Sequence, residues 1–328
     1  MISIQEIRNK ANKIIILNEH PAIIQSMLDF DYLSGKSEGS IVAIVTGRRG
    51  YAKYFFGRRE ILIPTHVSIS GVSSTGDPSK ARVGTPKVGG DSRTVNYWFF
   101  NNLSGRRTLS SVSSLLPSDF AGGVIFAEGV PELHSLQIIE QNTQLIIGPA
   151  SVGLVVPGFL KLGAIGGITP DQVEEGKLTE PGHVAVVSGS GGMTNELINV
   201  AIQAGQRLSF ALSYGGDRFP VLSPRDAFLL AESDPETTTV LYYGELGGED
   251  EYELVKLKED GKFTKHVIAH IAGTVASLFP ESPQFGHAKA KADKEKTTAL
   301  AKRAALKSAG FAVSNSFAEF IQLVNKLK

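Results

Sequence analysis

The sequence predicts an α/β protein with two domains, each built around a mainly parallel β-sheet. Its 328 residues exceed the roughly 250–300 residues over which a single core usually grows. Aliphatic runs of four or five residues recur along the chain and are followed by glycine-rich turns and helical patterns. Such runs are too short for helices and are typical of strands buried on both faces. We expect the domains to cover residues 1–150 and 151–328.

Composition excludes several classes of function. Lys plus Arg and Asp plus Glu number 33 each, so no net field attracts nucleic acid or an anionic membrane. The absence of cysteine excludes disulfides, thiolate catalysis and cysteine-bound metals. No apolar run reaches the ~20 residues of a membrane span, and the first residues lack a signal-peptide core. We therefore expect a soluble, cytoplasmic protein with no nucleic-acid or membrane partner.

The first domain begins with a predicted helix over residues 2–12 and a strand over 14–17. A helix with Pro21 in its first turn follows, because proline is tolerated at that position. The second strand is expected over residues 41–45. No G-x-G-x-x-G follows the first strand, which disfavours a dinucleotide and hence an NAD-dependent oxidoreductase.

A basic segment follows the second strand directly. Ligands of open α/β sheets bind beyond the carboxyl ends of strands, and arginine suits phosphate recognition. The segment is therefore a candidate phosphate site, and the simpler alternative is an exposed basic loop. Its candidate residues are Thr46, Gly47, Arg48, Arg49 and Lys53.

The stretch over residues 68–118 shows no sustained apolar period and is rich in serine. This composition predicts irregular structure, although a doubly wound domain needs a strand and a helix here. The stretch is either an insertion or the result of a sequence error. Regular structure is predicted to resume with a strand over 124–127, a helix over 132–141 and a strand over 145–147.

The sheet of the second domain is expected to start after a Gly- and Pro-rich connector over residues 153–182. A strand over 183–187 then leads into a glycine-rich turn and a helix over 191–205. Free backbone N–H groups and the helix dipole make such a turn an anion site. The candidate phosphate-binding residues are Ser188, Ser190, Gly191 and Gly192.

Further strands are predicted over residues 208–213, 240–243, 265–273 and 311–313, with helices between and after them. Glu245 follows one of these strands, where a carboxylate could orient an imidazole or cap the next helix. His266 and His270 are expected to be sheet residues, because neither is accompanied by other residues at the spacing of metal ligands. No metal site is predicted.

His287 lies between Gly286 and Ala288, in a tract of small residues. Glycine gives the backbone freedom to move such a side chain between two sites. By itself, a lone histidine in this context is more often a loop or packing residue. A long amphipathic helix is expected to follow it and to run through Gly310.

Three segments together resemble the catalytic parts of the nucleoside-diphosphate-forming acyl-CoA synthetases: residues 188–196, 244–248 and 283–288. Residues 12–64 and 123–328 resemble the α-type subunit of this superfamily, with the citrate branch nearest and succinyl-CoA synthetase more distant. The resemblance implies a Rossmann-like CoA-binding domain followed by a flavodoxin-like ligase domain. It departs from the family pattern at Gly189, where arginine is usual, and at Lys289, where glycine is common.

The resemblance also implies roles for individual residues. His287 would be phosphorylated, Glu245 would hold its ring, and Ser188, Ser190, Gly191 and Gly192 would bind the phosphoryl group. The basic segment after residue 45 would bind CoA. The turn that contains Glu128 and Pro131 and the turn over residues 148–153 would lie near its pantetheine arm.

The implied activity is that of the small subunit of an ATP-dependent citryl-CoA synthetase, which joins citrate and CoA with release of ADP and phosphate. ATP and Mg²⁺ would be bound mainly by a β-type ATP-grasp partner, and the end at Lys328 predicts that citryl-CoA is released uncleaved. The alternatives are a succinyl-CoA synthetase α subunit, the ligase part of an ATP-citrate lyase, and a CoA-binding regulatory module that is never phosphorylated.

Overall fold

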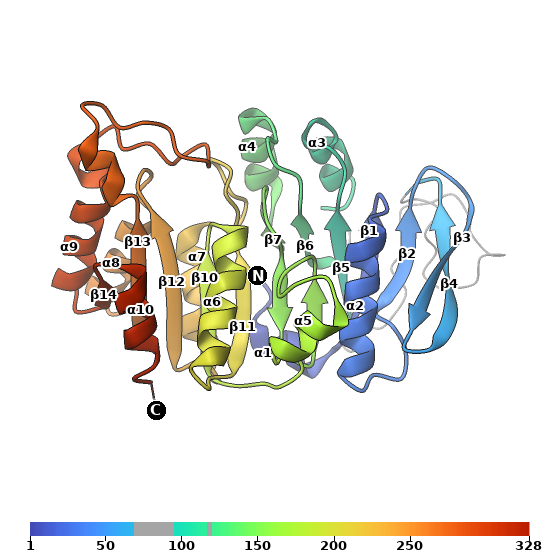
Figure 1. The fold of residues 1–328 in the computed structure, drawn as a ribbon. Coiled ribbons are helices and arrows are strands. Elements are labelled where there is room, and N and C mark those ends of the chain that lie inside the picture. Colours follow the sequence, from blue (N-terminus) through green and yellow to red (C-terminus); the bar gives the residue numbers. More distant parts are fainter. Residues whose placement is uncertain (69–94, 117–119, 328) are drawn as a thin grey trace.

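The structure is a computed structural model that describes residues 1–68, 95–116 and 120–327. Two seven-stranded sheets lie side by side, with helices packed on their faces (Figure 1). Both sheets are mainly parallel, so the predicted α/β class with two parallel sheets is confirmed. No helix within the described residues is long and apolar enough to span a bilayer.

The first sheet has the strand order β3-β4-β2-β1-β5-β6-β7. Only β3 runs antiparallel to its neighbour. Helix α1 ends earlier than predicted, because residues 11–13 already belong to the first strand. The elements of this half are α1 (Ile4–Asn9), β1 (Ala11–Leu17), α2 (Pro21–Leu33), β2 (Ile41–Val45), β3 (Gly50–Phe56), β4 (Arg59–His66), β5 (Val95–Asn101), α3 (Gly105–Ser113), β6 (Phe120–Ile125), α4 (Glu132–Gln141) and β7 (Leu145–Ile147).

The expectation of irregular structure over residues 68–118 is wrong for part of that stretch. Strand β5 lies in the middle of the sheet, between β1 and β6, and α3 follows it. Trp98, Phe99 and Phe100 are all fully buried, so the strand shows no polar alternation from which its period could be read. The rest of the stretch, residues 69–94 and 117–119, lies outside the described residues.

The basic segment after β2, for which an exposed loop was the simpler alternative, is a short turn followed by strand β3. Residues 50–56 and 59–66 form an antiparallel hairpin at the edge of the sheet. Strand β6 starts four residues before its predicted position because its glycines permit close packing. A Cβ on Gly122 would lie 1.9 Å from the Leu145 carbonyl oxygen, and one on Gly123 would lie 2.5 Å from the Phe99 ring.

The second sheet has the order β14-β13-β12-β10-β11-β8-β9. Its five parallel strands follow the flavodoxin-like order 2-1-3-4-5, and β8 and β9 add an antiparallel hairpin. The elements are β8 (Leu154–Val156), β9 (Leu160–Leu162), α5 (Pro170–Glu175), β10 (Val184–Ser188), α6 (Gly191–Gln203), β11 (Leu208–Ser213), α7 (Pro224–Ser233), β12 (Thr239–Glu245), α8 (Asp250–Glu259), β13 (His266–Ala272), α9 (Ala299–Ser308), β14 (Ala312–Ser314) and α10 (Phe317–Val324), with short 3₁₀ helices η3 (Thr274–Leu278) and η4 (Glu295–Thr297).

Two expectations for this half are corrected. The connector over residues 153–182 contains β8, β9 and α5. The helix after His287 begins only at Ala299, where the Thr298 hydroxyl accepts a hydrogen bond from Ala301 N. The charged segment before it instead forms a loop with one 3₁₀ turn.

The two sheets share one hydrophobic core, which runs from Ile14 in β1 to Phe210 in β11. Lys161 of β9 is buried within it and donates to Ser26 Oγ of α2 over 2.9 Å; burial lowers the pKa of Lys161 to about 7. Arg8 of α1 pairs with the buried Asp234 at 2.5 Å. The domain boundary near residue 150 stays a prediction.

Candidate active site

The switch point of the second sheet positions two candidate residues. Strand β10 has β11 on one side and β12 on the other, so the chain leaves their carboxyl ends in opposite directions. A ligand crevice forms at such a place. Ser188 is the last residue of β10 and Glu245 the last of β12.

His287 reaches this edge from a distant loop. Its Nδ1 lies 2.7 Å from Glu245 Oε1, and its ring lies over the backbone of Gly216, where a Cβ would come within 2.8 Å of Nε2. The carboxylate accepts a hydrogen bond from Nδ1–H, which leaves the lone pair on Nε2. The Glu245 carboxylate thus fixes the orientation of the His287 ring, an arrangement that can serve an imidazole nucleophile.

Two carboxylates raise the pKa of His287 above its ordinary value. The larger effect is the hydrogen bond to Glu245, and the charge of Glu128 adds to it, whereas burial and Lys289 act in the opposite direction. Glu128 lies in the turn after β6 of the first sheet. His287 therefore lies where the two sheets meet.

The turn after β10 opens helix α6 beside this histidine. Ser188 Oγ donates to the Tyr243 carbonyl oxygen over 2.9 Å and accepts from Ser190 N over 3.0 Å. Ser190 is the N-cap residue of α6. A Cβ on Gly191 would clash with Val152, whereas Gly192 faces open space. The two serines therefore fix the shape of the turn, and the helix N-terminus can attract an anion.

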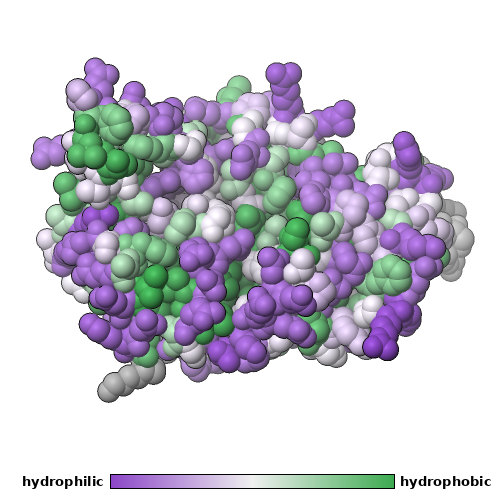
Figure 2. Space-filling model, in the orientation of Figure 1, coloured by the Kyte–Doolittle hydropathy of each residue, from purple (hydrophilic) through white to green (hydrophobic). Residues whose placement is uncertain are grey.

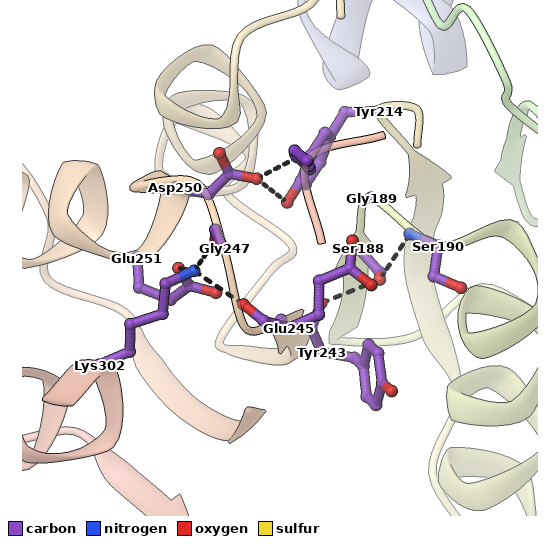
Figure 3. Close-up of a pocket in the computed structure, with 12 residues that line it drawn as sticks. Ser188, Gly189, Ser190, Tyr214, Tyr243, Glu245, Gly247, Asp250, Glu251 and Lys302 are labelled. Carbon is purple, nitrogen blue, oxygen red and sulfur yellow. Dashed lines mark hydrogen bonds and ion pairs between the residues drawn. The ribbon is translucent and has the colours of Figure 1, made fainter. Parts of the chain in front are cut away.

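A buried network of charged groups supports the turn after β12 (Figure 3). Lys302 of α9 is 1% exposed and pairs with Glu251 at 2.6 Å. It also donates to the carbonyl oxygens of Glu245, over 2.7 Å, and Gly247. The position of the Glu245 backbone thus depends on a lysine 57 residues later in the chain.

The other half of the network approaches the histidine loop. Tyr214 OH donates to Asp250 Oδ2 over 2.9 Å, and Lys289 pairs with the same oxygen. Burial alone would raise the pKa of Asp250, but the charge of Lys289 holds it below its ordinary value. Gly189 and Lys289 line one small cavity, so the two departures from the family pattern meet in space.

Sequence reasoning missed Asp217, which joins the two sheets. It accepts backbone hydrogen bonds from Gly129 N, at 3.4 Å, and Val130 N, at 3.1 Å, and burial raises its pKa. It lies in the turn directly after β11, at the carboxyl edge that marks Ser188 and Glu245. That position is a signal by which it could have been found. Tyr214 and Gly216 in the same turn, and the network residues Asp250, Glu251 and Lys302, were missed as well.

The predicted CoA residues fall into two groups. Thr46, Gly47, Arg48 and Arg49 form the turn between β2 and β3, where the Thr46 hydroxyl accepts from Arg48 N over 3.3 Å. Lys53 lies on β3 and pairs with Glu60 at 3.2 Å. Glu128 and Pro131 follow β6 at the same edge, three strand positions from β2. The groups are thus separated by about 14 Å, and neither touches the other.

An apolar patch lies beside the histidine loop. Four exposed side chains form it, Val275, Leu278, Phe279 and Leu300. Apolar side chains gather at the upper left of Figure 2, over the segment that links β13 to α9 in Figure 1. An exposed apolar patch commonly marks an interaction surface.

The chain is similar to known proteins over most of its length. Residues 187–312 match a family model described as CoA-ligase. The chain is 38% identical over 298 residues to an ATP-citrate synthase beta chain from Arabidopsis thaliana, covering 90% of this chain and 46% of the relative. Solved structures of ATP citrate lyase from Methanosaeta concilii in complex with (3S)-citryl-CoA, and from Methanothrix soehngenii with citrate and coenzyme A, are each 33% identical to it, with a TM-score of 0.86. Each of these matches covers 97% of this chain and 49% of the solved chain.

The chain therefore contains a CoA-ligase domain and is homologous to about half the length of these ATP-citrate synthases and lyases. The homology covers 90–97% of this chain and supports the expected resemblance to the succinyl-CoA synthetase/ATP-citrate lyase superfamily. The two-sheet architecture matches the CoA-binding and CoA-ligase domains of the solved relatives.

Proposed function

We propose that this chain is the phosphohistidine-carrying part of an ATP-dependent citryl-CoA synthetase. The observation that carries the proposal is the 2.7 Å contact of His287 Nδ1 with Glu245, next to the N-terminus of α6. A histidine held in this way presents Nε2 as the nucleophile. The backbone N–H groups of the α6 turn suit the phosphoryl group that it would receive.

The reaction would run in three steps. Neutral His287 attacks the γ-phosphorus of ATP, so that an Nε2–P bond forms and the P–O bond breaks with its electron pair on ADP; the Nδ1 proton stays on the ring against Glu245. A citrate carboxylate oxygen then takes the phosphoryl group, which restores neutral His287 and gives citryl phosphate. Attack of the CoA sulfur on the acyl carbon forms the thioester and expels phosphate, and the thiol proton passes to solvent.

Citrate is proposed as the acid because the solved relatives are ATP citrate lyases, in complex with citryl-CoA or with citrate and coenzyme A. The relative with the name ATP-citrate synthase beta chain supports a second chain, which we propose to be a β-type ATP-grasp subunit that binds ATP and Mg²⁺. We propose that CoA lies along the carboxyl edge of the first sheet, from the β2–β3 turn to the turn after β6. Its thiol end would then approach His287.

The test uses the chain in complex with its nucleotide-binding partner. After incubation with ATP and Mg²⁺, intact mass should show one acid-labile phosphoryl group, and His287→Ala should abolish it. His183→Ala is the matched control, because His183 is exposed and lies at the opposite end of β10, where its ring contacts Glu236. Labelling that persists in His287→Ala would contradict the phosphocarrier role.

The same complex identifies the acid. With CoA and either citrate or succinate, we expect ADP and a thioester to form with citrate, and no oxaloacetate. A preference for succinate would instead assign the chain to a succinyl-CoA synthetase. Oxaloacetate formed without an added lyase would indicate ATP-citrate lyase activity. Tight CoA binding with no phosphorylation would favour the alternative of a CoA-binding regulatory module.

A further inference from the structure

We propose that Lys289 is a phosphoryl-binding residue, whose ammonium group holds the phosphate carried by His287 while Asp250 keeps it in place. This inference rests on the proposed function. The histidine loop would thus supply its own cation, Lys289, in addition to the positive N-terminal end of α6 that the loop faces.

The loop fixes Lys289 close to the nucleophile. Lys289 follows His287 by two residues, and the turn between them is closed by hydrogen bonds from Ala290 N to the His287 carbonyl, over 3.0 Å, and from Phe285 N to the Ala290 carbonyl, over 2.9 Å. A Cβ on Gly247 would lie 1.9 Å from the Lys289 carbonyl oxygen. The loop therefore packs directly on the turn that follows Glu245.

The Lys289 side chain turns inward although it belongs to a surface loop. It is only 9% exposed, and its Nζ lies 5.1 Å from the centre of the Tyr214 ring. Tyr214 also faces Gly189, where a Cβ would lie 3.1 Å from the ring. The ammonium group is thus held at the cavity that the start of α6 also lines.

Lys289 has hydrogen-bonding capacity to spare. An ammonium group carries three donors, and Asp250 is the one acceptor that Lys289 contacts among the described residues. Lys302, the other lysine at this cavity, already has Glu251 and the carbonyl oxygens of Glu245 and Gly247 as partners. Two donors of Lys289 are therefore free for phosphoryl oxygens.

The charges around His287 create a need for such a cation. Glu245 contacts the ring, and Glu128 and Asp217 are close enough for their charges to interact with it. Asp250 and Glu251 lie in the network below. A phosphoryl dianion would be repelled by these carboxylates, and an opposite charge within a few ångströms offsets that repulsion. The cavity measures about 10 Å³, room for about one water, so the phosphoryl group would lie at its mouth.

The test compares four variants of the complex after phosphorylation by ATP and Mg²⁺ and removal of nucleotide: Lys289→Met, Lys289→Arg, Asp250→Asn and the control Lys291→Met. Lys291 is an exposed lysine of the same loop, so its variant has the same change of charge and shape. The readout is the ³¹P resonance of phosphohistidine titrated against pH. Melting temperatures show that each variant is folded.

Removal of a nearby cation should move the titration midpoint of the phosphoryl group upward by about one pH unit in Lys289→Met, with acid-labile phosphate lost about tenfold faster. Lys289→Arg and Lys291→Met should resemble the wild type. Asp250→Asn should leave the midpoint at or below the wild-type value, because the amide oxygen can still accept from Lys289, which keeps its position and its charge.

Three results would overturn the inference. A Lys289→Met midpoint equal to that of Lys291→Met would show that the ammonium does not reach the phosphoryl group, while leaving the phosphocarrier function intact. An equal upward shift in Asp250→Asn would show that Lys289 acts only as a tether for the loop. No acid-labile phosphate on the wild type would refute the proposed function itself, and this inference with it.

Discussion

Glu245 controls both the tautomer and the charge of His287. Its hydrogen bond to Nδ1 leaves Nε2 unprotonated when the ring is neutral, and it also raises the pKa of His287. Since only the neutral ring can attack phosphorus, phosphorylation should increase as the pH rises through this elevated pKa. The stability that the ion pair gives is present at low pH and is lost over the same rise, because the folded pKa exceeds the unfolded one.

We predict that Glu245→Gln lowers the phosphorylation rate by roughly 10²-fold or more, because the amide cannot stabilise the developing cation. The pH profile should move to lower pH, since the pKa of His287 loses its main elevating contact. Single-turnover labelling as a function of pH measures both effects. Affinity for CoA should be unchanged.

Glu249→Gln is the matched control for this variant. Glu249 lies four residues after Glu245 and pairs with Lys296 on the surface. Its variant therefore removes the same charge without changing a contact of the His287 ring. A fall in CoA affinity with normal phosphorylation in Glu245→Gln would show that its role has been misassigned.

The β2–β3 turn shows how an edge hairpin can present basic side chains. Strand β3 is antiparallel to β4, which sets the turn at the carboxyl edge where ligands of such sheets bind. Arg48 and Arg49 are exposed there, whereas Lys53 already has Glu60 as a partner. We therefore expect the two arginines to contribute more than the lysine to the proposed CoA site.

We predict that Arg48→Ala and Arg49→Ala each weaken CoA binding by about tenfold, the effect of one charge-assisted contact of about 1.5 kcal/mol. Calorimetry with CoA and dephospho-CoA tests this, and a smaller loss with dephospho-CoA would assign the contact to the 3′-phosphate. Arg58→Ala is the control, because the exposed Arg58 lies in the turn at the other end of the hairpin. Unchanged affinity in all variants would show that the turn is only a solvated surface.

At the scale of the whole molecule, the two sheets are joined at the edges that carry the candidate site residues. Gly216 N donates to the Ala150 carbonyl oxygen over 3.1 Å, and Val221 N donates to that of Gly148 over 2.7 Å. These contacts and Asp217 fix Glu128 of the first sheet near His287 of the second. On the outer side, the loop that carries His287 also carries most of the apolar patch.

We predict that the apolar patch binds the proposed nucleotide-binding chain. The double variant Leu278→Ser/Phe279→Ser should remain folded, because the two side chains are 79% and 49% exposed. Its affinity for the partner should fall by at least about tenfold, as expected for apolar contacts at the centre of an interface. Titration with the purified partner measures this.

Leu62→Ser is the control, since Leu62 is exposed on β4, next to the edge strand β3 at the far side of the first sheet. An equal loss of affinity in both variants, or none in either, would show that the patch is not the interface.

Local sequence pattern was sufficient for the strands whose ends carry the site. The short aliphatic runs of β2, β7 and β10 and the glycine-rich turn before α6 are visible as pattern, because each strand is mostly or fully buried and ends at a turn. Resemblance pointed to His287 and Glu245, which are 42 residues apart. Pattern failed at β5, whose aromatic run in a serine-rich stretch has no period, and at β8 and β9, whose burial depends on neighbours distant in sequence.

Only the tertiary structure decided how the site is held together. Asp217, Lys302 and Lys289 carry no local signature, because their roles come from contacts across loops and between sheets. From sequence alone, Lys289 is expected to be a solvated lysine of a surface loop. The structure shows instead that its ammonium group is buried beside Asp250. Sequence determined most of the elements and the sheet edge at which we propose the chemistry, since these follow from local burial and turn residues. The packing of distant elements determined which charges surround the histidine, since such charges interact through space and not along the chain.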